Sequence, residues 1–356
     1  MIADDLKALM MIPGLSGHEG RVAAAIAARM PVECRTDTMG NLIATFPGQG
    51  PSVMLFTHMD QLGLIVRKID DDGLIRVHRM GGVPERALPS QSVVLSTPDG
   101  RDISGVLANK SHHATGPDEK YTVLKAADLF IDTGHGSKAA VEAAGIRIGT
   151  PVTYAPNVVD LEGGRIAGTS VDDRAGCAVL LDVAAALARR DGGPPVHVVF
   201  STQEEFNLRG AVVAAQALQP DIAIQIDLML ACDTPDMAGQ GEMALGEGPG
   251  MSLYSFHGRG TLNGVLPHPA LVALFDETAS SEDMALQRSA QIGVLTDLSY
   301  VQSVGHGVAS IDLGFPMRYS HSSLEMCQIS DLEALSRLLV AGLARIGPDF
   351  PLERWA

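Results

Sequence analysis

The chain has 356 residues, 46% hydrophobic and 19% charged, which is the composition of a folded protein and argues against intrinsic disorder. Its formal net charge of −16 would repel phosphate backbones, so we expect no nucleic-acid partner. The apolar runs are shorter than the ~20 residues that span a bilayer, the N-terminus lacks the positive charge of a signal peptide, and the four cysteines form no Cys-x-x-Cys pair. These features predict a cytoplasmic protein with no membrane partner.

Residues 1–30 predict two helices around the loop "IPGLSGHEG" at 12–20, with Ser16 as a candidate cap of the second helix. The run "VMLFTHMD" at 53–60 is apolar and rich in strand formers, and it then becomes polar abruptly. That pattern is typical of a buried strand that ends at a functional site.

Residues 66–165 have a different sequence pattern from the residues before them. Short alternating segments such as "LIRVH" at 74–78 and "SVVLS" at 92–96 are separated by Gly, Pro and Asp. This pattern predicts a small β-barrel or sandwich. One helix interrupts it near "SKAAVEAAG", and Gly145 is a plausible stop for that helix.

Helices alternate with strands from residue 166 onward. We expect helices at 172–190, 209–218, 268–281 and 331–346, and strands at 196–200, 222–227 and 307–314. Such alternation predicts an α/β fold with a mostly parallel central sheet flanked by helices. We therefore expect a catalytic domain in two parts, 1–65 and 166–356, interrupted by a small β-barrel-like domain at 66–165.

Polar side chains follow several of the predicted strands. Because sites in open parallel sheets form outside the carboxyl ends of the strands, we expect these side chains to converge at one edge. They are His58 and Asp60, Glu204 and Glu205, Asp227 and His321, with Asp172 and Asp173 at a helix start.

Histidine and carboxylate ligands suit zinc, cobalt or manganese. The number of candidate ligands exceeds the three that one catalytic zinc commonly takes and fits a two-metal site with a bridging carboxylate. Each piece alone has an ordinary explanation: paired glutamates are usually solvated, and Asp-Asp-Arg at a helix start is most often a cap. Their joint placement at strand ends favours the metal site.

The motifs that carry these residues resemble the M42 family of dinuclear metallo-aminopeptidases, which includes glutamyl aminopeptidases and the tetrahedral TET peptidases. The resemblance extends along essentially the whole chain. Its motifs are "THMDQLGLIV", "GTSVDDRAGCAVLL", "STQEEFNLRGA", "IQIDLMLACDTPD" and "RYSHSSLEM".

The resemblance implies a role for each motif residue. Glu204 matches the general base that takes a proton from a metal-activated water, and Asp60 matches the catalytic aspartate that orients a ligating imidazole. Asp172 matches the ligand that bridges both metals and is often followed by a cis peptide bond. The resemblance implies two divalent ions per subunit, which are zinc or cobalt, with manganese as an alternative. The ligands that it implies are His58, Asp172, Glu205, Asp227 and His321.

The chain departs from the family pattern at three places. Gln61 replaces a glutamate, which removes a negative charge near the site. Asn207 replaces a glycine, and asparagine tolerates the left-handed backbone better than most residues. The 291–299 loop keeps Thr296 and Asp297 but loses glycines, so substrate preference does not transfer. Asp233 competes with Asp227 as a ligand, and we prefer Asp227 because it lies at the end of the strand itself.

The resemblance implies removal of N-terminal residues from short peptides. It also implies a homo-oligomer, with a dodecamer as the candidate assembly and the β-rich insert at the dimer contacts. One alternative is a related dinuclear amidohydrolase, a deacylase or carboxypeptidase, in which Arg174, Arg209 or Arg318 would bind the substrate carboxylate. Another is a metal-binding assembly protein without peptidase activity. His112 and His113, in the insert, are expected on a solvated loop.

Overall fold

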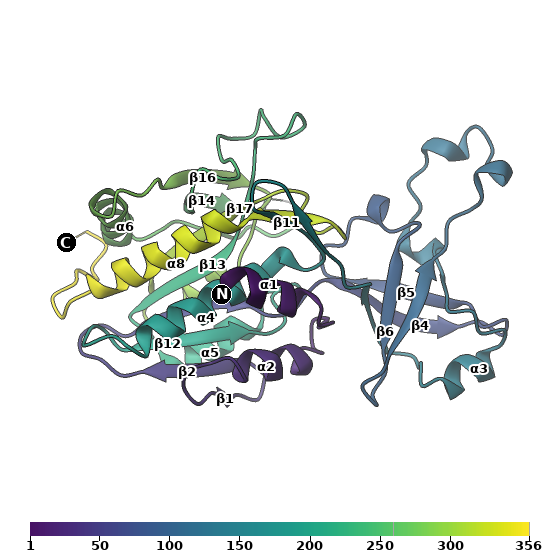
Figure 1. Ribbon diagram of the computed structural model, residues 1–356, viewed down its shortest axis with the longest axis horizontal. Helices are drawn as coiled ribbons and strands as arrows, with labels where there is room; N and C mark the ends of the chain where they lie inside the picture. The colour runs from purple at the N-terminus through teal and green to yellow at the C-terminus, as the bar shows by residue number, and fades with distance from the viewer. Residues whose placement is uncertain (259, 356) are drawn as a thin grey trace.

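The computed structural model describes residues 1–258 and 260–355 and has two lobes, a large layered one and a smaller one (Figure 1). The large lobe is built on a nine-stranded sheet. Its central strands β12, β3, β13 and β17 are parallel, whereas β2 runs antiparallel to β12 and β14 runs antiparallel to β17. In spatial order the strands are β1 (Arg35–Thr36), β2 (Leu42–Phe46), β12 (Val196–Ser201), β3 (Val53–His58), β13 (Ile222–Leu230), β17 (Ala309–Met317), β14 (Gly250–Phe256) and β15 (Gly264–Val265), with β16 (Gln287–Ile292) beside β14.

Helices cover both faces of this sheet, which explains why its central strands read as continuous apolar runs. One face packs on α1 (Ile2–Met10), α2 (Gly20–Ala27), α4 (Val171–Leu187), α6 (Pro269–Ser281) and α8 (Ile329–Ala344) in the main core. The other face packs on α5 (Gly210–Leu218) and α7 (Leu298–Val301) in a smaller core. The predicted α/β class with a mostly parallel central sheet is confirmed.

The smaller lobe is a closed barrel with its own hydrophobic core. Helix α3 (Lys138–Ala143) lies against it; Ser137 Oγ accepts a hydrogen bond from the Ala140 N–H (3.2 Å), and Gly145 ends the helix with φ +98°. In barrel order the strands are β4 (Gly63–Ile69), β5 (Ile75–Met80), β8 (Ile131–Asp132), β7 (Asp102–Leu107), β6 (Ser92–Ser96) and β9 (Pro151–Tyr154).

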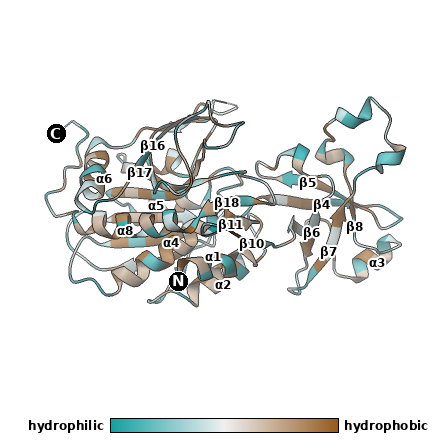
Figure 2. Cartoon of the chain, turned by 45° about the horizontal axis from the view of Figure 1, so that its top comes forward, coloured by the Kyte–Doolittle hydropathy of each residue, from teal (hydrophilic) through white to brown (hydrophobic). Residues whose placement is uncertain are grey.

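The smaller lobe also contains short helical turns, and some of them lie on a long loop that projects from it (Figure 1). Hydrophobic residues colour the strands of both lobes, whereas the projecting loop is largely hydrophilic (Figure 2). The turns are η1 (Glu85–Ala87), η2 (His112–Ala114), η3 (Glu119–Tyr121) and η4 (Ala126–Asp128).

A three-stranded sheet lies between the two lobes: β10 (Val158–Leu161), β11 (Arg165–Gly168) and β18 (Glu325–Gln328). Because β11 leads into α4 and β18 follows the segment that carries His321, this sheet holds two parts of the candidate site together. The predicted domain limits at residues 66 and 165 stay predictions. Among the described residues, no helix is long and apolar enough to cross a membrane.

Candidate metal centre

The predicted ligands meet at the carboxyl edge of the central sheet. His58 is the last residue of β3, Asp227 lies on the neighbouring β13, and Glu205 follows β12 on the other side of β3. The start of α4 supplies Asp172, and the loop after β17 supplies His321. Within each of two groups the ligand atoms lie within 4.8 Å of one another; the groups are His58, Asp172 and Asp227, and Asp172, Glu205 and His321.

Asp172 belongs to both groups, and its two oxygens face different histidines. Oδ1 lies 3.0 Å from His58 Nε2, whereas Oδ2 lies 3.6 Å from His321 Nε2. His321 Nε2 is also 3.8 Å from Glu205 Oε1. One carboxylate therefore stands between two sets of ligand atoms, which is the arrangement of a bridging ligand in a two-metal site.

Asp60 fixes the orientation of the His58 ring. The ring's Nδ1 lies 3.2 Å from the Asp60 backbone oxygen and 3.5 Å from its Oδ1, so Nε2 is the nitrogen that faces Asp172. Histidine ligands commonly hold their second nitrogen in this way.

Asp60 also organises the glutamate pair. Its carboxylate accepts hydrogen bonds from the backbone N–H groups of Glu204 (3.0 Å) and Glu205 (3.1 Å), and from Ser16 Oγ (2.5 Å). The prediction that Ser16 caps the second helix is therefore wrong, because its hydroxyl bonds to Asp60 and the N-cap of α2 is Glu19.

Glu325 is a site residue that the sequence did not reveal. It is buried at the start of β18, and its carboxylate accepts from the backbone N–H groups of Asp172 (3.0 Å) and His321 (2.7 Å). It thus joins the bridging ligand to a histidine about 150 positions away in the chain. Its position within the motif "RYSHSSLEM", four residues after His321, was the available signal.

Two glycines at the end of β5 bring the smaller lobe against the site. His321 Nδ1 lies 3.1 Å from the Gly82 backbone oxygen, which holds Nε2 toward Asp172. A Cβ on Gly82 would lie 2.8 Å from His321 Nδ1, and one on Gly81 would lie 3.1 Å from the Glu205 backbone oxygen. Any larger residue at Gly82 would therefore displace the imidazole.

The start of α4 has the cis Asp172–Asp173 peptide bond that the resemblance implies. Asp173 is turned away from the candidate metal groups. Its carboxylate accepts from Thr57 Oγ1 and from the Gly176 N–H, and so anchors the α4 N-terminus to β3.

The electrostatics of the site suit bound cations. Burial raises the pKa of Glu205 to about 7 and raises the pKa values of Glu204 and Asp227 well above their usual range. Burial alone would lower the pKa of His58, but its hydrogen bonds to Asp172 and Asp60 raise it well above its usual value. Glu205 Oε1 is buried and has no hydrogen-bond partner among the described residues. Divalent cations would neutralise the negative charge of these clustered carboxylates. The nitrogen and oxygen donors of the site fit such ions.

Two departures from the family pattern have clear structural roles. The Gln61 side chain does not face the candidate ligands; its Oε1 accepts from the Gly14 N–H (2.9 Å) and fixes the loop between α1 and α2. Asn207 has φ +69°, the left-handed conformation that asparagine tolerates. Asp233, the alternative to Asp227, pairs with Arg318 through distances of 2.8 and 2.6 Å.

The other residues singled out from the sequence lie elsewhere. Arg174 is fully buried behind the site, and the exposed Arg209 lies over the Phe206 ring. His112 and His113 are exposed on η2, in the projecting loop.

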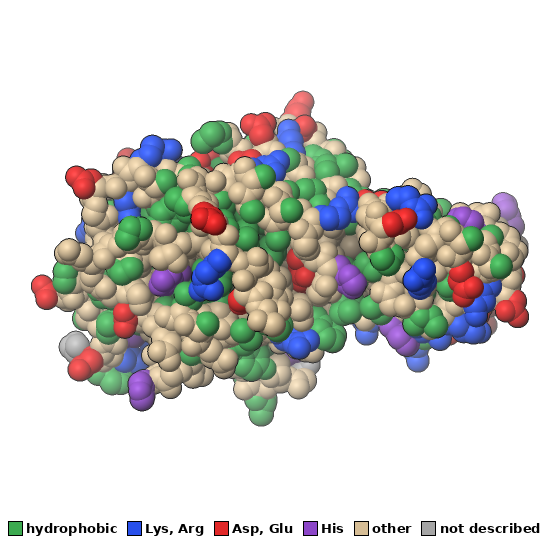
Figure 3. Space-filling view, turned by 90° about the horizontal axis from the view of Figure 1, so that it is seen from below, with side chains coloured by type: hydrophobic (Ala, Val, Ile, Leu, Met, Phe, Trp, Pro, Cys, Tyr) green, Lys and Arg blue, Asp and Glu red, His purple; other side chains and the backbone are tan. Residues whose placement is uncertain are grey.

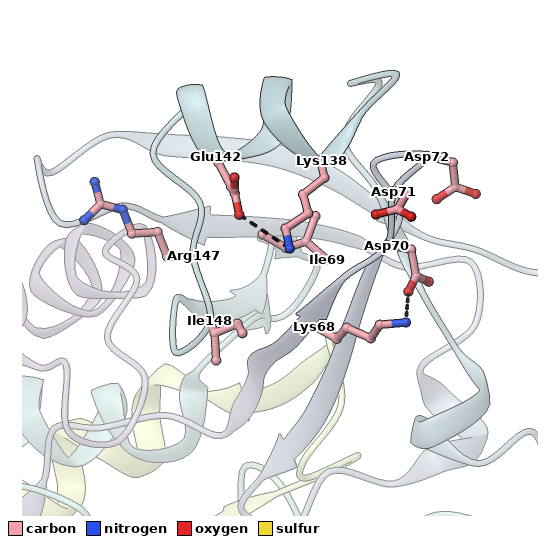
Figure 4. Close-up of a pocket in the computed structure, with 9 residues that line it drawn as sticks. All are labelled: Lys68, Ile69, Asp70, Asp71, Asp72, Lys138, Glu142, Arg147 and Ile148. Atoms are coloured by element: carbon pink, nitrogen blue, oxygen red, sulfur yellow. Dashed lines mark ion pairs between the residues drawn. The ribbon is translucent and has the colours of Figure 1, made fainter.

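A hollow of about 790 Å³ lies on the smaller lobe, between the 70–72 turn and α3 (Figure 4). Four of its charged groups form two ion pairs, Lys68–Asp70 (2.6 Å) and Lys138–Glu142 (3.9 Å). The face drawn in Figure 3 likewise intersperses acidic with basic side chains, most densely on the smaller lobe. This hollow therefore has the character of a solvated surface groove.

Comparisons with known proteins agree in sequence and in structure. The family profile described as M42 glutamyl aminopeptidase matches residues 40–338. The chain is 35% identical over 359 residues to the SgcX protein of Escherichia coli (strain K12), covering 99% of this chain and 96% of that one. It is 31% identical over 348 residues to the lysyl aminopeptidase of Pyrococcus furiosus, covering 96% and 97%.

Solved structures match over the full length. An aminopeptidase from the archaeon Desulfurococcus kamchatkensis is 32% identical, with a TM-score of 0.92 and coverage of 98% of this chain and 96% of that one. The TET1 peptidase of Pyrococcus horikoshii is 26% identical, with a TM-score of 0.88 and coverage of 97% and 100%, and it can assemble into a tetrahedron or a large octahedral shell.

Proposed function

Because this chain belongs to the M42 glutamyl aminopeptidase family and is a metal-dependent aminopeptidase, we propose that it removes N-terminal residues from short peptides at a dinuclear metal centre. The observation that carries the proposal is the position of Asp172, whose two oxygens face His58 (3.0 Å) and His321 (3.6 Å). A carboxylate between two ligand sets is what a two-metal site requires.

The ligands divide into two sets around that bridge. His58 and Asp227 would hold one ion and Glu205 and His321 the other, with Asp172 common to both. Nitrogen and oxygen donors suit zinc or cobalt, with manganese as an alternative. When bound, such ions act as Lewis acids that polarise a carbonyl and lower the pKa of coordinated water.

Glu204 is the proton acceptor in this proposal. Its backbone N–H is held by Asp60 (3.0 Å), and among residues 1–258 and 260–355 no hydrogen bond engages its carboxylate. The carboxylate is therefore free to take a proton from the attacking water and return it to the leaving amine. Asp60 acts as a positioning residue, because it contacts His58 and the backbone of both glutamates.

We further propose a homo-oligomer, with a dodecamer as the candidate assembly, that acts in the cytoplasm. The full-length match to TET1, a peptidase that assembles into a tetrahedron, supports the assembly. The cysteines, which are free thiols in the structure, suit a reducing compartment. The smaller lobe, which projects from the large lobe (Figure 1), is the expected dimer contact.

A deacylase or carboxypeptidase has less support, because such an enzyme needs a cation for the substrate carboxylate. Of the three arginines considered, Arg174 is fully buried, Arg318 pairs with Asp233, and Arg209 lies over Phe206. A metal-binding assembly protein without peptidase activity would have no use for the free Glu204 carboxylate beside the ligands.

The test is a substrate panel on the full chain reconstituted separately with zinc, cobalt and manganese. We expect aminoacyl-anilides to be hydrolysed and N-acyl amino acids to be left intact. Hydrolysis of the N-acyl compounds alone would support the amidohydrolase, and hydrolysis of neither class with any metal would support the assembly protein.

A further inference from the structure

The loop that carries the glutamate pair has an unfavourable backbone conformation. Gln203, Asn207 and Leu208 have φ values of +55°, +69° and +54°, in the left-handed region that residues other than glycine rarely adopt. Such a backbone persists only where the surrounding structure holds it in place. The contacts that hold this loop therefore determine where the Glu204 carboxylate lies.

Backbone hydrogen bonds close this loop at its two ends. Three successive carbonyl oxygens at the start of the loop accept from three successive N–H groups at its end. The pairs are Thr202–Gly210 (3.0 Å), Gln203–Arg209 (3.2 Å) and Glu204–Leu208 (2.8 Å). These bonds fix the carbonyl groups at the start of the loop, and the N–H groups of residues 203–205 bond to other segments.

Carboxylates from two distant segments accept those three N–H groups. Asp60 accepts from Glu204 (3.0 Å) and Glu205 (3.1 Å). Glu19 Oε1 accepts from the Gln203 N–H (3.0 Å). These acceptors lie 144 positions before Glu204 and 184 positions before Gln203, so the tertiary fold brings them to the loop.

Glu19 occupies a helix cap position but uses its side chain elsewhere. It is the N-cap of α2, where Ser, Thr, Asp and Asn are the preferred residues, and within the described part of the chain its carboxylate makes no cap bond to that helix. Its Oε1 accepts instead from the Gly17 N–H (2.7 Å) and from the Gln203 N–H. Glu19 is only 5% exposed, so these bonds are made in a largely water-free setting. The side chain therefore serves the loop of the glutamate pair and not α2.

The segment that carries Glu19 is itself fixed to the residues after β3. Gln61 and Gly14 exchange two hydrogen bonds, from the Gly14 N–H to Gln61 Oε1 (2.9 Å) and from the Gln61 N–H to the Gly14 oxygen (2.9 Å). The Ser16 N–H donates to the Gln61 backbone oxygen (3.2 Å), and its hydroxyl donates to Asp60 (2.5 Å). Glu19 thus extends from a well-anchored support.

We propose that Glu19 is a positioning residue for the proton acceptor Glu204; this rests on the proposed aminopeptidase function. Two peptide groups flank Gln203, and their orientation sets the direction of Glu204. The bonds to Arg209 and Asp60 fix the second of these groups, whereas the bonds to Gly210 and Glu19 fix the first. Glu19 therefore acts on Glu204 through the backbone and takes no part in proton transfer.

This role needs a hydrogen-bond acceptor and not a negative charge. Burial and, to a smaller extent, the charge of Asp60 raise the pKa of Glu19 to about 7. A carboxyl group has an oxygen that accepts N–H bonds in either protonation state, and the side-chain oxygen of glutamine is the same kind of acceptor at the same chain length. Glutamine at position 19 can therefore replace the glutamate, whereas alanine leaves the Gln203 N–H without its partner.

The experiment compares zinc-loaded wild type, Glu19→Ala and Glu19→Gln in the hydrolysis of an aminoacyl-anilide. We expect kcat of Glu19→Ala to fall about 10- to 100-fold with KM within about threefold of wild type, because a small displacement of a catalytic group lowers the rate steeply. In Glu19→Gln we expect kcat to stay within about threefold of wild type. Zinc content, measured by elemental analysis, stays at the wild-type level in both variants.

The matched control is Glu33→Ala, which removes an exposed carboxylate from the segment after α2 and keeps the wild-type kcat. Three results would overturn the inference and leave the aminopeptidase function standing. They are an unchanged kcat in Glu19→Ala, an equal loss of kcat in Glu19→Ala and Glu19→Gln, and a loss of kcat that follows a loss of zinc.

A second measurement needs no variant and covers the case in which Glu19→Ala does not fold. Hydrogen exchange of the wild type, read by mass spectrometry on overlapping peptides, reports the protection of the Gln203 N–H. We expect it to exchange at least about tenfold more slowly than in an unstructured peptide. Exchange at the unprotected rate rejects the role of Glu19, whereas a wild type that cleaves no anilide with any metal rejects the proposed function and the inference together.

Discussion

At the residue scale, the single carboxylate of Asp172 belongs to both groups of candidate ligands. Its Oδ1 and Oδ2 face separate histidines, and its backbone N–H is held by Glu325. The adjacent glutamates divide their work in a similar way. Glu205 faces His321, while Glu204 makes no side-chain hydrogen bond within residues 1–258 and 260–355 and so is available for proton transfer.

Replacing the Glu204 carboxylate tests that division. In Glu204→Gln we expect kcat to fall by about 10²- to 10⁴-fold, because the amide cannot accept the proton. Metal content, measured by elemental analysis, stays at the wild-type level because Glu204 is not a ligand in this account. A variant that keeps wild-type turnover would remove Glu204 from the mechanism.

Glu325 holds the backbone of two candidate ligands, Asp172 and His321, so we expect its loss to weaken metal binding. Glu325→Ala leaves the backbone N–H groups of Asp172 and His321 without their acceptor, and we expect a 10- to 100-fold loss of metal affinity in a zinc titration. Glu333→Ala, at an exposed position on α8, is the control and keeps wild-type affinity. Equal affinity in both variants would reduce Glu325 to a packing residue.

Most of the candidate ligands could be chosen from the sequence because each follows an apolar run that ends at one edge of a parallel sheet. Ser16, Gly82 and Glu325 could not, because their roles come from contacts between distant segments: Ser16 with Asp60, Gly82 with His321, and Glu325 with Asp172. No local pattern marks the contacts of Ser16 and Gly82, and the motif that contains Glu325 and His321 does not by itself reveal the contact of Glu325 with Asp172. The chosen ligands match the two groups in the structure, but their metal binding remains a prediction.

At the scale of elements, the end of β5 is the part of the smaller lobe that reaches the candidate site. Gly81 and Gly82 pack against Glu205 and His321, and the Gly82 carbonyl accepts from the His321 ring. The barrel therefore influences the centre through one strand end, in addition to any role in assembly.

A methyl group at this contact gives a direct test. In Gly82→Ala the new Cβ would lie 2.8 Å from His321 Nδ1, so we expect the ring to move and metal occupancy to fall toward one ion per chain. Gly136→Ala, where a Cβ meets nothing within 4 Å, is the matched control and keeps the wild-type occupancy. Full occupancy in Gly82→Ala would mean that the barrel contact is not needed to hold His321.

Long helices and buried parallel strands were predictable, because α4, α6, α8 and β13 have strong apolar patterns. Strands β16 and β18 were not, since "QRSAQI" is polar and half exposed and "EMCQ" has only four residues. Their positions depend on pairing with β14 and β11. Such edge strands form because partners exist, and the sequence pattern carries little of that information.

At the scale of the whole molecule, the buried carboxylates make the stability of the metal-free protein depend on pH. Burial raises the pKa of Asp173 to about 8 and those of Glu205 and Asp312 to about 7, above their unfolded values near 4. A raised acid pKa contributes stability that is present at low pH and is lost as pH rises through the folded value. The histidines with lowered pKa values, such as His197, act in the opposite direction, because they cost stability as pH falls below about 6.5 and cost none above it.

We therefore expect the melting temperature of the chelator-treated protein to fall between pH 6.5 and pH 8.5. Zinc should raise the melting temperature most at the upper end, because metal ligands must be deprotonated. Differential scanning fluorimetry with and without zinc measures both effects. A melting temperature that rises with pH in the chelator-treated protein would show that these acids are not buried as described.

The most direct measurement is anomalous diffraction at the zinc edge from crystals of the full chain grown with zinc. The account predicts two peaks on either side of Asp172, one contacted by His58 and Asp227 and the other by Glu205 and His321. A single peak, or peaks that do not share Asp172, would contradict the dinuclear centre.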